Sequence, residues 1–597
     1  MPGQYTGGEW NSITKNHANT NVKMVLAFPD AYSIGMSHLG MQILYGLLNE
    51  RNDTACERVF APLADMEALM RKHAIPLFSL ETYTPLKNFD ILGFSLQYEL
   101  SYTNVLNMLD LAEIPVLASE REEADPLIIA GGPSAISPEP LADFIDIFIV
   151  GDGEESLPQL IEIFKDSKLQ NLSRKEKIIR IAQTMKNAYV PALYEVFYHQ
   201  NNTIKNIIPK MPDLPTTIRS ASVKDLNTVY YPTKPIVPYV KTIHDRITIE
   251  VMRGCTQGCR FCQAGMSKRP TRPRTVDNIM KLAELSYANT GYNEISLASL
   301  SISDYPFLKP LMERLHRFFN PRQVNISFPS LRVNEHLVLL PSMLNTVRKS
   351  GITLAPEAAT PELRKIINKN ISDEDLYKGT EEAFKQGWSL VKLYFMVGLP
   401  TETDADIDAI AQLAYNVSDL KKGINGSFGQ INISIAPFVP KAHTPFQWHP
   451  MVTMGRIHEI KKRLFDKIHR KCIRIKFHNT ERSLLEGIFA RGDRRLGSVL
   501  YQAWRDGCKF DAWEEHFNYT KWMNAFQKAG VDWTFYIHRT REENEIFPWD
   551  HINCGVIKPF LLNEKQKSFV RETTPDCRIT HCPECGSCVR SRNFYAA

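Results

Sequence analysis

The sequence predicts an α/β protein in three parts: an N-terminal doubly wound domain, a partial (β/α)6 barrel, and a mainly helical C-terminal region that ends in a cysteine-rich tail. Short apolar runs alternate with amphipathic helical patterns in residues 1–190 and again in 246–450, which is typical of parallel sheets. A proline-dense stretch at 191–245 separates them and predicts an irregular linker. Residues 451–597 show mainly helical periodicity before the tail.

Composition is consistent with this division. The chain has 597 residues, 43% of them hydrophobic, which suits about three domains with real cores. Its net charge of +5 is a weak excess for this length and neither demands nor excludes a nucleic-acid partner. The first thirty residues lack a charged and then apolar leader, and no apolar run approaches the ~18 residues that span a bilayer. We therefore expect a cytoplasmic protein.

Four strands are expected in the N-terminal domain, and glycines follow the last two. The strands are predicted at 22–29, 89–97, 127–133 and 145–153. Gly131 and Gly132 end one of these segments, and Gly151 and Gly153 end the next. The carboxyl ends of parallel strands form the edge where such sheets bind ligands, so these four glycines are candidate cofactor contacts.

The barrel is expected to contain six strands, each followed by a helical segment. They are predicted at 246–252, 293–300, 324–331, 350–358, 389–400 and 430–440. In a barrel of this kind, the functional side chains lie at the carboxyl ends of the strands.

Three cysteines follow the first predicted barrel strand in the segment RGCTQGCRFCQAGM. Cys255, Cys259 and Cys262 have the spacing C-x-x-x-C-x-x-C, and cytosolic thiols so closely spaced indicate metal binding rather than disulfides. Three thiolates can hold three irons of a cubic cluster and leave the fourth iron open, as a catalytic centre requires. A structural zinc site would need a fourth ligand, and the motif contains no His.

At these residues the chain resembles the radical S-adenosylmethionine (SAM) superfamily, in which an aromatic residue, here Phe261, precedes the third cysteine. The resemblance implies a [4Fe–4S] cluster on the three cysteines, with SAM bound at the open iron beside Phe261. It also implies reductive cleavage of SAM to a 5′-deoxyadenosyl radical that abstracts hydrogen from a substrate. A reductase such as flavodoxin or ferredoxin would supply the electron.

Five other barrel residues are candidates for this chemistry. Ser299 and Ser301 follow the second strand, where the family usually binds the SAM amino group, and Glu357 at the end of the fourth strand is a further SAM contact or a helix-start charge. Lys392 on the fifth strand is either catalytic or part of a barrel ion pair. His443, beyond the sixth strand, is a candidate acid or base, although a lone His is usually structural.

The N-terminal domain resembles the cobalamin-binding domain that precedes many radical SAM barrels. The segments AGGPSAISPEPL and VGDGEESLPQLI carry this resemblance, which implies that Gly131, Gly132, Gly151 and Gly153 approach a corrin or its nucleotide tail. Tyr32 stands where the cobalamin signature has its cobalt-ligating His. Cobalamin therefore binds without a protein His ligand, or the domain is only a scaffold.

The tail holds a second cysteine group, DCRITHCPECGSC. Cys577, Cys582, Cys585 and Cys588 can close a metal site without help, and both an auxiliary [4Fe–4S] cluster and a tetrahedral zinc satisfy that count. His551 and His581 are nearby alternative ligands.

The leading functional hypothesis is a radical SAM transferase that methylates an unknown substrate with the help of cobalamin, or performs a similar group transfer. A second enzyme hypothesis is methylthiotransferase-like sulfur insertion with the tail as an auxiliary cluster. A third is a non-catalytic Fe–S sensor associated with RNA or the ribosome, since residues 482–513 are basic and aromatic. No membrane partner is expected.

Overall fold

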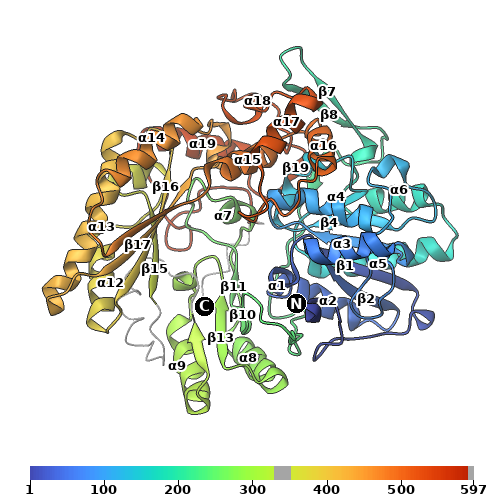
Figure 1. Cartoon of the computed structure of the whole chain (residues 1–597), viewed down its shortest axis with the longest axis horizontal. Coiled ribbons are helices and arrows are strands. Elements are labelled where there is room, and N and C mark those ends of the chain that lie inside the picture. Colours follow the sequence, from blue (N-terminus) through green and yellow to red (C-terminus); the bar gives the residue numbers. More distant parts are fainter. Residues whose placement is uncertain (328–350, 589–597) are drawn as a thin grey trace.

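The computed structural model describes residues 1–327 and 351–588. The N-terminal α/β domain and the barrel lie side by side, and C-terminal helices run across the top of both (Figure 1). Those helices are α15 (Thr480–Ala490), α16 (Leu496–Arg505) and α17 (Tyr519–Ala529). The fold is the predicted α/β arrangement with a mainly helical C-terminal region.

A six-stranded sheet forms the N-terminal domain. Its order is β2-β1-β3-β4-β5-β6, and all neighbours are parallel except β5 and β6. The strands are β1 (Val22–Phe28), β2 (Thr54–Phe60), β3 (Ile91–Ser95), β4 (Leu127–Gly131), β5 (Ile147–Ile149) and β6 (Ala188–Tyr189). All four strands expected from the sequence are present, together with β2 and β6.

Helices cover both faces of this sheet, as in a doubly wound domain. One face packs on α2 (Leu39–Asn49), α5 (Gly153–Leu169) and α6 (Arg174–Thr184). The other packs on α3 (Ala64–His73), α4 (Tyr102–Leu111) and the C-terminal helices α15, α16 and α17. The short helix α1 (Tyr32–Gly35) follows β1. Because the C-terminal helices share this core, the far end of the chain is part of the N-terminal domain's packing.

The proline-dense linker is more regular than its sequence suggests. It contains an antiparallel hairpin of β7 (Tyr194–Tyr198) and β8 (Ile204–Pro209), where an irregular linker was expected. The hairpin turn needs no glycine because Asn202 takes the left-handed conformation, with φ of 67°. Farther along, β9 (Ile218–Arg219) pairs with β19 (Ile552–Asn553), so the linker also pairs with the C-terminal region.

The barrel consists of two described sheets. One has the order β10-β13-β14 and the other β15-β16-β17-β18, with all neighbours parallel. The strands are β10 (Ile247–Glu250), β13 (Glu294–Ala298), β14 (Asn325–Ser327), β15 (Ile352–Glu357), β16 (Leu390–Val397), β17 (Gln430–Pro437) and β18 (Ile473–Phe477). The six predicted strands are all present, although residues 328–331 and 350 of two predictions lie outside the described residues. The strand β18 lies beyond residue 450, where mainly helix was expected.

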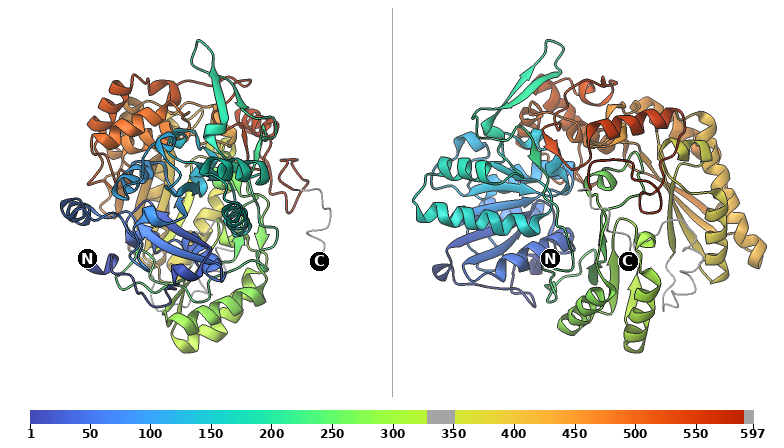
Figure 2. Two further views of the ribbon diagram at one scale, coloured as in Figure 1. Left: turned by 90° about the vertical axis from the view of Figure 1, so that its right-hand side faces the viewer. Right: turned by 180° about the vertical axis from the view of Figure 1, so that it is seen from behind.

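Helices cover the outer face of the barrel sheets (Figures 1 and 2). They are α8 (Val276–Thr290), α9 (Leu308–Phe319), α12 (Asp373–Lys385), α13 (Asp404–Asn425) and α14 (Met454–Phe465). The remaining helices are α7 (Gln263–Ser267), α11 (Pro361–Ile366), α18 (Thr534–Ile537) and α19 (Lys558–Phe569). A two-stranded ladder of β11 (Met252–Arg253) and β12 (Arg272–Pro273) brackets α7. Within the described ranges, no helix is long and apolar enough to cross a membrane.

Candidate active site

The three cysteines of the first group lie on the loop between β11 and α7. Cys262 is the residue that caps α7, and its Sγ accepts a hydrogen bond from the Gly265 N–H at 3.3 Å. A Cβ at Gly265 would lie 3.4 Å from that sulfur, so the glycine leaves the sulfur accessible. Donation of an N–H to sulfur suits a thiolate that carries negative charge at a helix N-terminus.

Burial makes these thiols hard to ionise alone. Burial first, and then the charge of the neighbouring Cys259, raise the pKa of Cys255 to about 12 and that of Cys262 to about 11. Thiols that repel one another as anions favour a bound cation, which is the condition for a metal site. In the arrangement seen for residues 1–327 and 351–588, no three His, Cys, Asp or Glu side chains already form a metal-binding group. The donor set itself fits an iron–sulfur cluster with one open iron.

Phe261 places the loop at the carboxyl ends of the barrel strands. Its ring packs against an apolar cluster that includes Ala358, Leu399 and Phe438, which directly follow or nearly follow β15, β16 and β17. Met396 on β16 contacts the same cluster. The cysteine loop therefore lies at the edge of the barrel where catalytic groups are expected.

Two residues that the sequence analysis missed hold this loop. The Asn368 side-chain amide donates to the carbonyl groups of Gln257 and Gly258 at 3.2 and 3.1 Å, and to Thr574 O at 3.0 Å. Arg260, which is fully buried, donates to the Lys365 and Ile366 carbonyls at 3.0 Å each. No local motif marks either residue, because their partners are distant in the sequence.

The tail of the chain returns to the cysteine loop. Arg260 pairs with Glu564 at 3.1 Å and donates to Glu572 O at 2.7 Å, while the Gln257 amide donates to Asp576 at 3.1 Å. Cys577, the first residue of the second cysteine group, directly follows Asp576. The structure therefore brings the two predicted cysteine groups to the same part of the molecule.

Within the tail, the four thiols differ in exposure. Cys585 is buried, Cys577 is half-buried, and Cys582 and Cys588 are exposed. Burial raises the pKa of Cys577 to about 11 and also raises that of Cys588, and the charge of Arg269, just beyond α7, opposes both shifts. For Cys585, burial is outweighed by a backbone hydrogen bond from Ser587 and by Arg269, so its pKa is lowered. A cation that follows the first cysteine loop therefore acts on the second cysteine group.

The predicted SAM contacts lie around the same edge. Ser299 and Ser301 follow β13, and the Ser301 hydroxyl is buried without a hydrogen-bond partner among the described residues. Glu357 ends β15 with a left-handed φ of 67°, a strained conformation that a functional role would explain. Burial raises the pKa of Glu357, and Lys369 opposes this from 3.6 Å. The charges of Glu357 and Lys369 also act on the pKa of Cys262, so both side chains lie close to the cysteine loop.

Lys392 and His443 lie in different environments. Lys392 is half-buried on β16 and forms no ion pair with any described residue, which disfavours the barrel ion pair considered from the sequence. His443 is buried, and its Nε2 lies 3.0 Å from the Ile136 carbonyl of the N-terminal domain. Burial lowers the pKa of His443, so its ring is neutral and links the two domains.

The glycines predicted to approach a corrin are packed against the chain itself. A Cβ at Gly132 would lie 2.5 Å from Leu96 O, one at Gly151 would lie 2.2 Å from Ala221 O, and one at Gly153 would lie 2.9 Å from Leu44. Gly131 would meet Ile149 O at 3.4 Å. Tyr32 is buried and donates to Glu9 at 2.8 Å. Close approach of the chain to itself accounts for Gly132, Gly151 and Gly153, and contact of the four glycines with a corrin stays a prediction.

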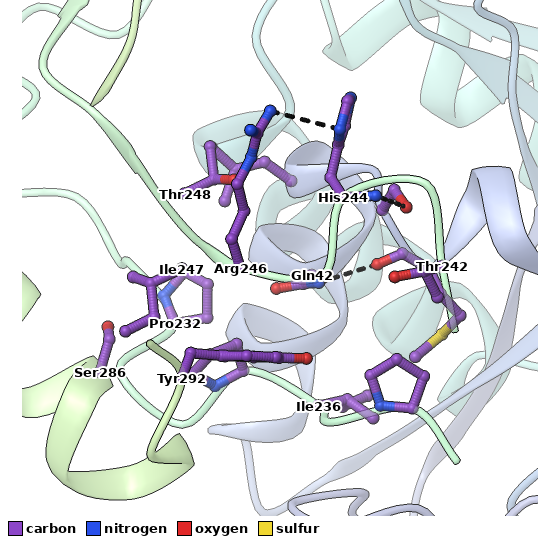
Figure 3. A pocket seen from close by; sticks show the side chains of 15 residues that line it. Gln42, Pro232, Ile236, Thr242, His244, Arg246, Ile247, Thr248, Ser286 and Tyr292 are labelled. Carbon is purple, nitrogen blue, oxygen red and sulfur yellow. Dashed lines mark hydrogen bonds between the residues drawn. The ribbon is translucent and has the colours of Figure 1, made fainter. Parts of the chain in front are cut away.

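Two cavities lie elsewhere. One of about 20 Å³, room for a single water, lies where α2, the linker and β10 meet, with Gln42, His244, Arg246 and Tyr292 around it (Figure 3). The other, of about 610 Å³, lies between the β7–β8 hairpin and residues 542–546. Neither is lined by a residue predicted from the sequence to act in catalysis or binding.

Comparison with known families agrees with this geometry. Residues 249–414, which include the cysteine loop, match the radical SAM superfamily, and residues 40–191 match the N-terminal region of radical SAM proteins. The chain belongs to the radical SAM superfamily. As a radical SAM enzyme, it uses a [4Fe–4S] cluster and SAM.

Individual relatives of this radical SAM enzyme cover much of the chain. An uncharacterized protein of Methanocaldococcus jannaschii is 28% identical over 518 residues, 85% of this chain and 98% of the relative. The ribosomal protein uS12 methylthiotransferase RimO of Thermotoga petrophila is 20% identical over 340 residues, 52% of this chain and 74% of the relative.

Solved structures show weaker likeness. The radical SAM methyltransferase TsrM of Kitasatospora setae has 11% identity and a TM-score of 0.49 over 85% of this chain and 99% of its own. The cobalamin-dependent enzyme OxsB has 12% identity and a TM-score of 0.44 over 92% of this chain and 79% of its own.

Proposed function

We propose that this enzyme cleaves SAM reductively at a cluster held by Cys255, Cys259 and Cys262, and that the reaction serves a group transfer, most simply methylation. The observation that carries the proposal is the placement of three thiols on one loop at the carboxyl edge of the barrel, inside the segment that matches the superfamily. When bound, the cluster and SAM supply a 5′-deoxyadenosyl radical.

The chain's own residues bind and shield this chemistry. The Ser301 hydroxyl, which has no hydrogen-bond partner within residues 1–327 and 351–588, and the Glu357 carboxylate are suited to accept hydrogen bonds from the SAM ammonium and ribose. Phe261 and its apolar cluster exclude water from one side of the loop, which protects a reactive radical. Lys392, which forms no ion pair in the described structure, is suited to contact the substrate rather than to support the barrel.

We propose a metal for the tail as well. Four thiols within twelve residues suit either a second [4Fe–4S] cluster or zinc, and Arg269 offsets their negative charge. A reductase such as flavodoxin or ferredoxin would deliver an electron at the protein surface. Cys582 and Cys588 are exposed, so an iron–sulfur cluster in the tail would be accessible to that reductase.

A second candidate reaction is sulfur insertion. The match to RimO, a methylthiotransferase, and the second cysteine group beside the first both favour it. Cobalamin-dependent methylation, the finer expectation from the sequence, has no support from the packed glycines. A retained corrin would favour cobalamin-dependent methylation, and its absence together with iron in the tail would favour sulfur insertion.

The test is anaerobic. Iron is reconstituted, SAM and dithionite are added, and 5′-deoxyadenosine is measured for the wild type, for Cys255→Ala and for a control, Cys472→Ala, which alters a cysteine outside both groups. We expect product from the wild type and the control and at least about a hundredfold less from Cys255→Ala, since removing one ligand opens the cluster. Hydroxocobalamin is added in parallel, and its spectrum is followed after desalting. A fully loaded wild-type cluster that yields no 5′-deoxyadenosine would contradict the proposal.

A further inference from the structure

The four-stranded sheet β15-β16-β17-β18 has two chemically different faces. Side chains alternate between the faces along each strand. On one face, Val391, Leu393, Ile431, Ile433 and Ile473 belong to the apolar core that packs on the barrel helices. Figure 1 shows α12, α13 and α14 on that outer side. The alternate residues, which include Lys392, Tyr394, Asn432, Ser434, Arg474 and Lys476, point the other way, toward the inside of the barrel.

The inner face is polar and ordered into rows by the strand register. Residues paired across parallel strands share a face, so the register defines which side chains stand together. The first row is Thr353, Lys392, Asn432 and Arg474, and the second is Tyr394, Ser434 and Lys476. His478 lies one step beyond Lys476 on the same face, with its Nε2 3.5 Å from the Ser434 hydroxyl.

Three cations on this face have no carboxylate partner in the part of the chain that the structure describes. Arg474 and Lys476 are exposed, Lys392 is half-buried, and none of the three forms an ion pair within residues 1–327 and 351–588. No Asp or Glu occurs in β16, β17 or β18. Glu486, whose charge acts on His478, is already paired with Lys441 at 2.8 Å. Three unpaired cations on one inner surface form a field that attracts anions.

The two rows lie on the same strand face as Met396, which packs beside the cysteine loop. Met396 follows Lys392 and Tyr394 on the same face of β16, and it packs in the apolar cluster that contains Phe261. Each step of two residues along a strand covers about 7 Å. An anion held at the first two rows would therefore lie about 7–13 Å along the strand from Met396, leaving room for a substrate to extend to the loop.

From this arrangement we infer that the substrate carries phosphate, bound by Lys392, Arg474 and Lys476 on the inner face of β16, β17 and β18. The inference rests on the proposed function, since it assigns the substrate class of that site. Arg and Lys side chains on one concave surface are a recurrent means of binding phosphate. In the first row Asn432 lies between Lys392 and Arg474, and in the second row Ser434 lies beside Lys476, so both side chains are placed to donate hydrogen bonds to the same phosphate oxygens.

Tyr394 adds a second recognition element. It is 39% exposed although it lies on a central strand, and within the second row it lies between Lys392 and Met396 along β16. An exposed aromatic ring beside cations is suited to stack on a nucleobase. The phosphate therefore belongs to a nucleotide or to a single strand of nucleic acid, and the experiment separates these two sources.

The test measures binding to the iron-loaded, SAM-bound enzyme. The probes are tripolyphosphate, ATP and a fluorescent single-stranded RNA of twelve nucleotides, used at two or more salt concentrations. The variant Arg474→Gln/Lys476→Gln is compared with Lys281→Gln/Lys462→Gln, which removes the same charge from exposed positions on α8 and α14. Lys392→Gln is a third, independent variant. Iron content and Tm are measured for each protein.

We expect the inner-face pair to bind at least one probe about tenfold more weakly than the wild type, with a salt slope lower by about 2, while the control pair changes about twofold at most. Tighter binding of RNA than of ATP assigns a nucleic-acid strand, and the reverse assigns a nucleotide. Tyr394→Leu should weaken ATP and RNA but not tripolyphosphate.

Equal losses in the inner-face and control pairs, or no binding of any probe by the wild type, would overturn the inference. These outcomes are distinct from failure of the proposed function, because wild-type formation of 5′-deoxyadenosine is measured separately. If the wild type cleaves SAM but the phosphate probes do not distinguish the two pairs, only the substrate class is wrong.

Discussion

At the residue scale, the amide of Asn368 joins two chain segments at the cysteine loop. Its nitrogen donates to three carbonyl groups, and its oxygen accepts from the Thr574 N–H at 2.9 Å. Buried carbonyl groups left without a donor cost about 1–3 kcal/mol each. Asn368 also has a left-handed φ of 53°, which Asn and Gly adopt readily.

We predict that Asn368→Gly lowers the iron retained per chain by about half or more, because the loop loses its donor while the backbone angle stays allowed. Iron and sulfide are assayed after anaerobic reconstitution and desalting. Asn320→Ala, at an exposed position in the barrel, is the control and should retain wild-type iron. Full iron retention in Asn368→Gly would show that the loop holds its shape without the amide.

The sequence alone predicts the cysteines of the loop but not the residues that hold the loop in place. Cys255, Cys259 and Cys262 could be predicted because their spacing is local, and Phe261 lies among them. Asn368 and Arg260 could not, because each acts through partners about one hundred to three hundred residues away. The basic inner rows were visible only as isolated residues such as Lys392, since strand register decides which residues stand together.

At the element scale, the end of β5 packs against the linker. Gly151 has φ of 104° and bridges to Ala221, and a Cβ there would lie 2.2 Å from Ala221 O and 2.3 Å from Ala221 N. Its place at the carboxyl end of a parallel strand predicted a contact with a cofactor. In the structure, close approach of two backbones accounts for it.

We predict that Gly151→Ala destabilises the fold by about 1–3 kcal/mol, through overpacking and an unfavourable φ. A lower Tm measured by scanning calorimetry would show this. The control is Gly423→Ala in α13, where a Cβ meets nothing within 4 Å and alanine favours the helix. An unchanged Tm for Gly151→Ala with loss of a bound corrin would instead support the cofactor role.

The barrel illustrates which elements the sequence could predict. All six expected strands were found because each is a buried apolar run with regular alternation. The seventh, β18, reads IRIKF, a short alternating run between helical segments that is weak evidence by itself. Only its pairing with β17 makes it part of the sheet.

At the scale of the whole molecule, a buried carboxyl joins the N-terminal domain to the C-terminal helices. Asp511 accepts from Thr103 on α4 at 2.8 Å and from the Trp522 indole on α17 at 2.9 Å. Burial raises the pKa of Asp511 from 3.8 to about 6, against the effect of both hydrogen bonds. Between these pH values the folded chain binds more protons than the unfolded chain, so the free energy of unfolding falls as pH rises through this interval.

We predict that Asp511→Asn removes this pH-dependent decrease in the free energy of unfolding, because the amide does not ionise and keeps an acceptor oxygen. The Tm of the variant relative to the wild type should therefore rise between pH 4 and pH 7, as measured on the metal-free chain to avoid loss of the cluster in acid. An exposed aspartate, Asp466→Asn, is the control. A difference in Tm that stays constant with pH would contradict a raised pKa for Asp511.

The return of the tail to the cysteine loop has a consequence for how the protein is made. Arg260 on this loop contacts Glu572, which lies 312 residues later in the chain, and Gln257 contacts Asp576, which lies 319 residues later. During synthesis the loop therefore leaves the ribosome long before these two partners are translated. Iron that binds the loop earlier is held without Glu572 and Asp576, so stable insertion of iron follows translation of residues 564–576.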